Sequence, residues 1–255
     1  MTSEALAEGQ KVVELNDRIL RHYGQVLCRD ARILDFGCGR GRHMHEYQDA
    51  GYEQVFGFDV HDDTGMTDHA ERFRFGFLEP GQPYRIPFPD DHFDFVMSTS
   101  VFEHVSNQAG AIAEIARVLK PDGVTIHVFP SRWRPIEPHI FVPFGGVLQE
   151  RWWLALWAAI GIRNGFQHGL AAKDVVSRNL AYCENGIHYR NTGEIDALWR
   201  TCFASVERAE SAFIESTRTV SSVSRMLHLV IRMLPGLVNL YRFAHTSVVL
   251  AWNPR

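Results

Sequence analysis

ILDFGCGRGRH, residues 33–43, is the stretch that decides the fold of this chain. An apolar run containing Asp35 leads into three glycines at alternate positions, and Arg42 then begins a segment that can form a helix. In this arrangement a buried parallel strand delivers a backbone loop to a small-molecule ligand. Because glycine has no Cβ, Gly37, Gly39 and Gly41 let the main chain approach such a ligand closely.

Two other interpretations of this loop have to be weighed. The dinucleotide fingerprint G-x-G-x-x-G is one, but Arg42 stands where that fingerprint needs its last glycine. A tight strand-to-helix turn without any ligand is the other. The glycine loop alone therefore does not decide the function.

A carboxylate follows at the spacing that a nucleoside site requires. Residues 54–59 predict a short apolar strand that ends at Asp59. An acid at the tip of the second strand, about 20 residues after the glycine loop, is placed to accept hydrogen bonds from ribose hydroxyls. A nicotinamide enzyme would use the same acid, and a plain helix-capping aspartate would also fit, so Asp59 does not separate these alternatives.

Composition limits the classes of protein to consider. The chain has 255 residues, of which 45% are hydrophobic and 22% charged, with a net charge of −4, as in ordinary globular proteins. This charge argues against a general nucleic-acid binder. The four cysteines are dispersed without a C-x-x-C pair, and the acidic segment 1–10 lacks the character of a signal peptide, so we expect a cytoplasmic protein.

A second block makes the pattern specific. Residues 85–105 read RIPFPDDHFDFVMSTSVFEHV, and residues 117–123 read RVLKPDG. Together with the glycine loop led by Asp35, these stretches resemble the class I S-adenosylmethionine-dependent methyltransferases, in particular the small-molecule type that includes the quinone-methylating group. The resemblance covers residues 31–130 and implies S-adenosylmethionine as the cofactor and a small-molecule substrate.

The resemblance and the hydrophobic periodicity together predict an α/β fold. We expect a Rossmann-like, doubly wound, seven-stranded sheet, mostly parallel with an antiparallel final strand, and helical insertions after strand 5 and between strands 6 and 7. The periodicity predicts helices over 42–50, 109–119 and 192–202, and strands over 71–78, 93–98, 124–129, 204–211 and 246–252. Residues 1–255 are expected to form one methyltransferase domain, with an N-terminal helical cap (1–28), a lid or substrate insertion (131–190) and a helical insertion (217–243).

The resemblance also implies which residues hold the cofactor. These residues are Asp35, Gly37, Cys38, Gly39, Gly41, Asp59, Glu79 and Ser98. The adenine contact is the least defined of them, because the segment after the third strand offers both Glu79 and Gln82. The sequence departs from the family pattern at this contact, and the pattern loosens beyond residue 129.

Two histidines are candidates for a general base that takes a proton from a hydroxyl acceptor. His104 follows the fourth strand and His139 lies in the loop after the fifth; His104 could alternatively only fix its loop. Some related methyltransferases bind magnesium through E-x-x-E-H at this place. Here Ser100 replaces the first carboxylate, and a hard cation would lose a charged oxygen ligand, so we predict no metal.

The sequence thus predicts a methyltransferase that acts on a small, apolar or aromatic acceptor, with O-methylation favoured. A NAD(P)-dependent oxidoreductase and a non-catalytic SAM-fold binding or membrane-associated protein are the alternatives. Residues 219–243 are mostly apolar and are too short and charged to span a bilayer. They can cover the substrate pocket, pair with a second subunit in a homodimer, or lie on a membrane surface as a peripheral contact.

Overall fold

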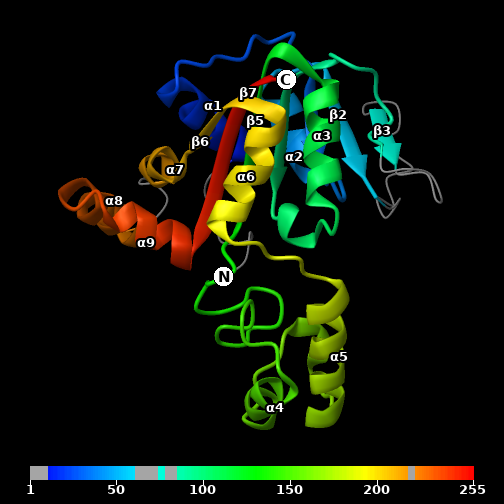
Figure 1. Ribbon diagram of the computed structural model, residues 1–255, viewed down its shortest axis with the longest axis vertical. Helices are drawn as coiled ribbons and strands as arrows, with labels where there is room; N and C mark the ends of the chain where they lie inside the picture. Colours follow the sequence, from blue (N-terminus) through cyan, green and yellow to red (C-terminus); the bar gives the residue numbers. More distant parts are fainter. Residues whose placement is uncertain (1–10, 61–73, 78–84, 218–221) are drawn as a thin grey trace.

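A seven-stranded sheet forms the centre of the computed structural model, which describes residues 11–60, 74–77, 85–217 and 222–255 (Figure 1). The strand order is β3-β2-β1-β4-β5-β7-β6, and β7 runs antiparallel to both of its neighbours while β1 to β5 are parallel. The strands are β1 (Ile33–Phe36), β2 (Val55–Asp59), β3 (Arg74–Phe77), β4 (Phe93–Thr99), β5 (Leu119–Pro130), β6 (Phe203–Arg208) and β7 (Thr246–Pro254). This confirms the predicted fold class.

Helices cover both faces of the sheet because successive side chains of each strand enter opposite cores. Ile33 belongs to the core beneath α1 (Val12–His22), α2 (Arg42–Asp49) and α7 (Glu210–Thr217), whereas Leu34 belongs to the core beneath α3 (Gln108–Val118) and α6 (Thr192–Cys202). Each fully buried aliphatic side chain contributes roughly 1.5–3 kcal/mol. A parallel sheet needs this double cover, which explains the continuous apolar runs of β1 and β4.

The local predictions match most elements and differ at two strands. β5 begins at Leu119 rather than at residue 124, with a register shift against β4 between Phe93 and Phe95. β6 ends at Arg208, before the predicted residue 211, because α7 begins at Glu210. The buried Glu210 carboxylate accepts hydrogen bonds from the backbone N–H of Val248 and from Arg242, which turns the chain out of the sheet.

The insertion after β5 forms a lobe at the edge of the sheet where the parallel strands end (Figure 1). Its two helices, α4 (Arg151–Ala159) and α5 (Ala172–Asn185), pack against each other over small cores of their own. One of these cores contains Ile140, Leu154 and Cys183. The lobe therefore folds around local apolar contacts and presents its inner side to the carboxyl edge of the sheet, where ligands bind in such folds.

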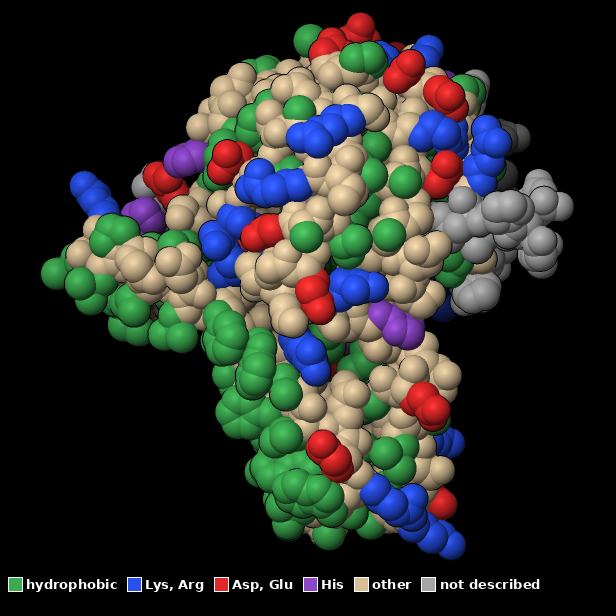
Figure 2. All heavy atoms as spheres, in the orientation of Figure 1, with side chains coloured by type: hydrophobic (Ala, Val, Ile, Leu, Met, Phe, Trp, Pro, Cys, Tyr) green, Lys and Arg blue, Asp and Glu red, His purple; other side chains and the backbone are tan. Residues whose placement is uncertain are grey.

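Two further helices, α8 (Ser222–Met233) and α9 (Leu237–Ala244), precede β7 and project from the side of the molecule (Figure 1). Ile231 and Tyr241 pack into the core beneath α1 and α7. The opposite faces leave large apolar side chains in solvent, among them Met226, Met233 and Leu240, and Figure 2 shows apolar side chains gathered over this projection. Among the described residues, no helix is both long and apolar enough to cross a bilayer.

Candidate cofactor and acceptor site

The glycine loop between β1 and α2 uses its glycines in two ways. Gly37, Gly39 and Gly41 have positive φ angles of 78°, 49° and 72°, a region that favours glycine. A Cβ on Gly37 would lie 2.4 Å from Cγ2 of Val101, so this position is required by packing inside the protein. A Cβ on Gly39 would meet no atom of the described residues within 4 Å, apart from its chain neighbours, which leaves space for a ligand beside the loop.

Asp59 is turned toward this loop. Its Oδ2 accepts a hydrogen bond of 2.8 Å from the backbone N–H of Gly39, and its Oδ1 accepts one of 2.7 Å from that of Val60. The backbone N–H groups of Gly37 and Cys38 donate to the carbonyl oxygen of Phe58, which fixes the loop against the end of β2. Among the described residues each carboxylate oxygen of Asp59 accepts one backbone hydrogen bond, and an ionised carboxylate oxygen can accept a second from a ligand hydroxyl.

Asp35 is a buried acid just before the loop. Burial raises its pKa to about 6, and its Oδ2 has no hydrogen-bond partner in the described part of the chain. A buried, unpaired carboxylate oxygen is costly, and a cationic amine is the partner that its chemistry fits. Cys38 is also buried, which raises the pKa of its thiol, so it contributes shape and backbone rather than a thiolate.

Ser98, one of the predicted cofactor residues, is not directed toward the loop. The hydroxyl of Ser98 lies 2.7 Å from Nδ1 of His127, on the side of the sheet that α3 and α6 cover. Met97, its neighbour in β4, is the residue in register with Asp35, and alternate strand residues face opposite sides. Glu79 lies outside the described residues.

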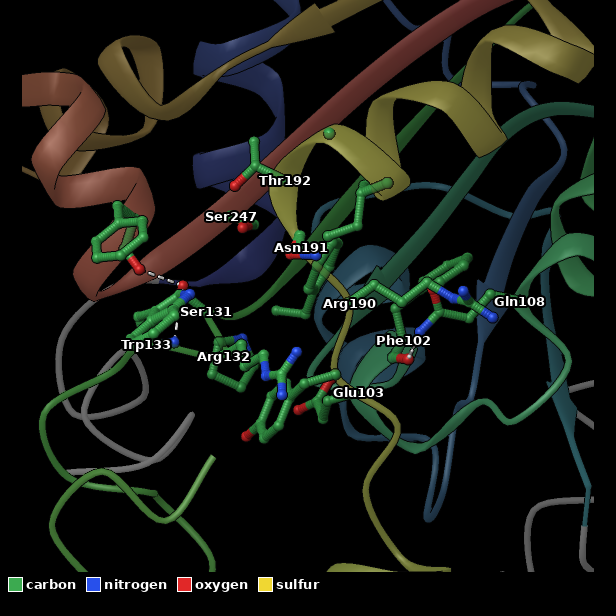
Figure 3. Close-up of a pocket in the computed structure, with 16 residues that line it drawn as sticks. Phe102, Glu103, Gln108, Ser131, Arg132, Trp133, Arg190, Asn191, Thr192 and Ser247 are labelled. Carbon is green, nitrogen blue, oxygen red and sulfur yellow. Dashed lines mark hydrogen bonds between the residues drawn. The ribbon is translucent and has the colours of Figure 1, made fainter. Parts of the chain in front are cut away.

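A pocket of about 260 Å³ lies beyond the ends of β4 and β5, beside the start of α6 and of β7 (Figure 3). Aromatic rings and polar groups share its walls: Phe102, Glu103, Gln108, Phe129, Pro130, Ser131, Arg132, Trp133, Tyr189, Arg190, Asn191, Thr192, Gly193, Ile195, Phe243 and Ser247. Val101, which packs against Gly37, directly precedes Phe102 of the pocket wall. The pocket therefore lies at the same edge of the parallel strands as the glycine loop and is a candidate site for a methyl acceptor.

The two predicted histidines meet at the edge of this pocket, with ring centroids 4.8 Å apart. Nδ1 of His104 lies 2.6 Å from the carbonyl oxygen of Gly186, and Nδ1 of His139 lies 2.6 Å from Oε1 of Glu137. Because a carbonyl only accepts, His104 carries its proton on Nδ1, and the carboxylate favours the same tautomer in His139. Burial lowers the pKa of His104 and thus favours its neutral form.

Glu137 anchors this arrangement. Its buried carboxylate accepts hydrogen bonds from the His139 ring, from the backbone N–H groups of His139 and Ile140, and from the Tyr189 hydroxyl at 3.0 Å. Burial by itself would raise the pKa of Glu137, but the hydrogen bonds from His139 and the backbone outweigh it and hold the pKa below its usual value. Glu137 is therefore ionised and fully paired at neutral pH.

Glu103 is the opposite case. It has no exposed surface, and neither carboxylate oxygen has a hydrogen-bond partner among the residues that the structure describes. Burial raises its pKa to about 8. Nε2 of His104 lies 3.9 Å from its Oε1, and single ligand atoms of Glu103, His104 and His139 all lie within 4.8 Å of one another. Sequence reasoning singled out both histidines but not this cluster.

Comparisons with known proteins agree with the glycine-loop half of the site. Residues 34–127 match the family model described as a methyltransferase domain. The chain is 33% identical over 121 residues to the uncharacterized methyltransferase YcgJ of Bacillus subtilis, covering 44% of this chain and 45% of that protein. A probable S-adenosylmethionine-dependent methyltransferase of Mycolicibacterium smegmatis is 30% identical over 105 residues, with coverages of 41% and 40%. The chain thus spans less than half the length of these curated relatives.

Solved structures extend the likeness to the whole fold. Phosphoethanolamine N-methyltransferase 2 of Haemonchus contortus aligns with a TM-score of 0.51 at 16% identity, over 95% of this chain and 52% of that one. The [4+2]-cyclase SpnF aligns with a TM-score of 0.50 at 16% identity, over 94% and 80%. At this identity the likeness concerns the fold alone, and because the second protein is a cyclase, the fold by itself does not fix the reaction.

Proposed function

Because the chain carries a class I S-adenosylmethionine-dependent methyltransferase domain, we propose that the protein transfers a methyl group to a small, apolar or aromatic acceptor, with O-methylation favoured. The structural observation that carries the proposal is the Asp59 carboxylate held against the glycine loop by the N–H of Gly39, which supports a nucleoside site. A strand-to-helix turn without a ligand does not require a carboxylate beside a glycine that has free space next to it. A nucleoside site does, because the carboxylate binds the ribose hydroxyls. The match of residues 34–127 to a methyltransferase domain favours S-adenosylmethionine over a nicotinamide cofactor.

The cofactor is S-adenosylmethionine, which supplies a methyl group that is already electrophilic because it is bonded to a positively charged sulfur. We assign ribose binding to Asp59, close main-chain approach to Gly39, and pairing with the amine to the free oxygen of Asp35. Gly37, Cys38 and Gly41 set the shape of the loop. Orientation by such residues can contribute up to about 7–11 kcal/mol in well-aligned systems. Ser98 and Glu79 stay predictions without a contact that supports them.

The acceptor class is supported by the pocket beyond β5. The rings of Trp133 and Phe243 stack with centroids 5.2 Å apart at its wall, and Phe129 adds a further apolar surface. Arg132 and Arg190 provide donors for an oxygen substituent. This combination suits an apolar or aromatic body that carries a hydroxyl. The insertion 131–190 supplies part of the wall, in keeping with the proposed role as a lid or substrate region.

His104 and His139 are our candidates for the base that removes the acceptor proton. In both rings Nδ1 is engaged, which leaves the Nε2 lone pair to accept a proton. The lowered pKa of His104 keeps that lone pair available at neutral pH. The two side chains approach from different segments, so each is tested separately.

Methyl transfer is tested with isotopically labelled S-adenosylmethionine and a panel of phenols, quinols and isoprenoid alcohols, with products identified by mass spectrometry. We expect a labelled methyl ether from at least one hydroxylated acceptor. His104→Ala or His139→Ala should lower kcat while leaving S-adenosylhomocysteine affinity unchanged. Cofactor binding without turnover of any acceptor class would favour the non-catalytic alternative, and label transferred to carbon or nitrogen would refute O-methylation.

For the apolar projection formed by α8 and α9 we propose contact with a second copy of the chain, with a membrane surface as the alternative. The side chains of Met233 and Leu240 are 81% and 58% exposed. Large apolar side chains gathered on an exposed surface are typical of a surface that binds a protein or a membrane. Light scattering of wild type and of Met233→Glu should show a dimer that the variant loses. A monomeric wild type that floats with liposomes would instead support the membrane contact.

The compartment we propose is the cytoplasm, which fits four free cysteines.

A further inference from the structure

We propose that Glu103, His104 and His139 bind a divalent transition-metal cation at the wall of the acceptor pocket. Glu103 and His104 lie on the short 3-10 helix Phe102–His104 that follows β4, and His139 reaches them from the insertion after β5. Their ligand atoms all lie within 4.8 Å of one another. Metal binding is a property beyond the methyl transfer proposed above and can be measured without any cofactor or acceptor.

Both imidazoles have the hydrogen-bond pattern that is typical of metal-bound histidines. Nδ1 of His104 donates to the carbonyl of Gly186, and Nδ1 of His139 donates to the carboxylate of Glu137. Metal-bound histidines almost always give their second ring N–H to a carbonyl or carboxylate in this way, which fixes the tautomer and ring orientation. Both Nε2 lone pairs are thereby left for a cation.

Glu103 supplies an independent reason to expect a cation. It is fully buried, yet both of its carboxylate oxygens lack a hydrogen-bond partner within the described ranges, while its backbone carbonyl accepts a bond from His188. A buried acid without donors is an unfavourable arrangement that native structures rarely keep without a function. A cation bound by this carboxylate and by Nε2 of His104, which lies 3.9 Å from Oε1, with His139 as the third ligand, would give the buried carboxylate a charged partner.

The ligand set selects the kind of cation. Two imidazoles and one carboxylate suit zinc and similar transition metals, whereas magnesium prefers oxygen ligands. Bonds of about 2.0–2.2 Å place tetrahedral ligand atoms roughly 3–4 Å apart, so small side-chain rotations would close the present spacing. The sequence predicted no metal because Ser100 stands where the magnesium pattern has its first carboxylate. In the proposed site His139 supplies the third ligand instead.

The position of the cluster gives the cation a role. Glu103 also lines the acceptor pocket, and a cation held by three protein ligands would keep a coordination position for water or a substrate atom. An acceptor hydroxyl bound to the cation would have a lower pKa and would release its proton to water, so in the metal-bound protein the two histidines would act as ligands and not as the base; this part of the inference rests on the proposed methyl transfer. In Figure 3, Glu103 lies at the same side of the pocket as Arg132.

The test titrates Zn²⁺ and, separately, Mg²⁺ into the untagged full chain after removal of metal with a chelator, using calorimetry without cofactor. We expect one Zn²⁺ per chain and no comparable Mg²⁺ binding. Glu103→Gln and His139→Asn should weaken Zn²⁺ binding at least 100-fold. Glu137→Gln, which removes only the carboxylate behind His139, should weaken it about 10–100-fold. His168→Asn, an exposed histidine of the same insertion, should bind as wild type does.

Two further readouts keep the outcome decisive. Co²⁺ should give a visible absorption spectrum of nitrogen-ligated metal in wild type and His168→Asn but not in Glu103→Gln. Circular dichroism in chelator establishes that each variant is folded. No Zn²⁺ binding by wild type, or equal binding by Glu103→Gln, overturns the metal site. S-adenosylhomocysteine binding by the same samples shows independently whether the proposed function stands.

Discussion

The two ends of the ligand-binding edge are built in different ways. Beyond the carboxyl ends of β1 and β2 the site is made mostly of main chain, and Asp59 accepts hydrogen bonds from the N–H groups of Gly39 and Val60. Under β4 and β5 it is made of buried side chains that arrive from distant segments, such as Glu103 and His139. The first end is complete once a strand, loop and strand have formed. The second exists only when the insertion has packed against the sheet, so the two ends should respond differently to substitution.

The largest effect is expected in the glycine loop. Gly39→Val places a side chain in space that no atom of the described ranges fills, so affinity for S-adenosylhomocysteine should fall more than about 100-fold, or roughly 3 kcal/mol. The positive φ of 49° adds strain of about 1–2 kcal/mol. Calorimetry with the folded variant measures the loss.

Gly37→Val is the matched control for that prediction. Its Cβ would lie 2.4 Å from the Val101 side chain, so it should destabilise the fold itself by roughly 1–3 kcal/mol in thermal unfolding. Unchanged ligand affinity in Gly39→Val would show that the open side of the loop does not face the cofactor.

At the other end, the two buried glutamates should behave in opposite ways. Glu137→Gln removes charge-assisted bonds from the His139 ring and from two backbone N–H groups, and should lower the free energy of unfolding in chelator by about 2–3 kcal/mol. Glu103→Gln removes a carboxylate that has no hydrogen-bond partner in the described part of the chain, and it should change the free energy of unfolding by less than about 1 kcal/mol. Urea denaturation measures both. Equal destabilisation by the two substitutions would show that the Glu103 carboxylate contributes as much to stability as the hydrogen-bonded Glu137 carboxylate does.

Asp59→Ala should weaken S-adenosylhomocysteine binding by about 2 kcal/mol, because it removes an acceptor for ribose hydroxyls and frees the N–H of Gly39. Asp94→Ala is its control. Asp94 lies near the opposite end of β4, where it accepts hydrogen bonds from Arg32 and Lys120, and its loss should leave ligand affinity unchanged. Equal affinities for wild type and Asp59→Ala would remove Asp59 from the cofactor site.

The smallest effect concerns pH. Burial raises the pKa of Asp35 to about 6, so the folded protein holds a proton that the unfolded chain has already released. Stability of the cofactor-free protein should therefore fall as pH rises from about 5 to about 7, by roughly 1 kcal/mol from this group. Asp35→Asn should flatten that part of the profile. A profile that Asp35→Asn leaves unaltered would show that Asp35 is ionised throughout.

The cofactor end could be predicted from sequence because its signals are local. The glycine spacing of 37–41 and the acid that closes β2 are each carried by consecutive residues, and apolar runs mark the parallel strands. Ser98 was placed in the site from the resemblance alone; its direction depends on the register of β4 against β1 and β5, which sequence does not state.

The acceptor end could be predicted only in part because its contacts are long-range. His104 and His139 were recognised one at a time, but their meeting depends on the carbonyl of Gly186 and on Glu137, which the insertion brings together. The start of α7 was also missed, since Glu210 acts through a bond to Val248 far along the chain. Helix α6, with local capping by Asn191 and Glu194, was predicted correctly.

The most direct test of the account is calorimetric titration of the purified protein with S-adenosylhomocysteine and, in parallel, with NADH. We predict one molecule of S-adenosylhomocysteine bound per chain at micromolar affinity and no comparable NADH binding. Tight binding of NADH without binding of S-adenosylhomocysteine would contradict the account.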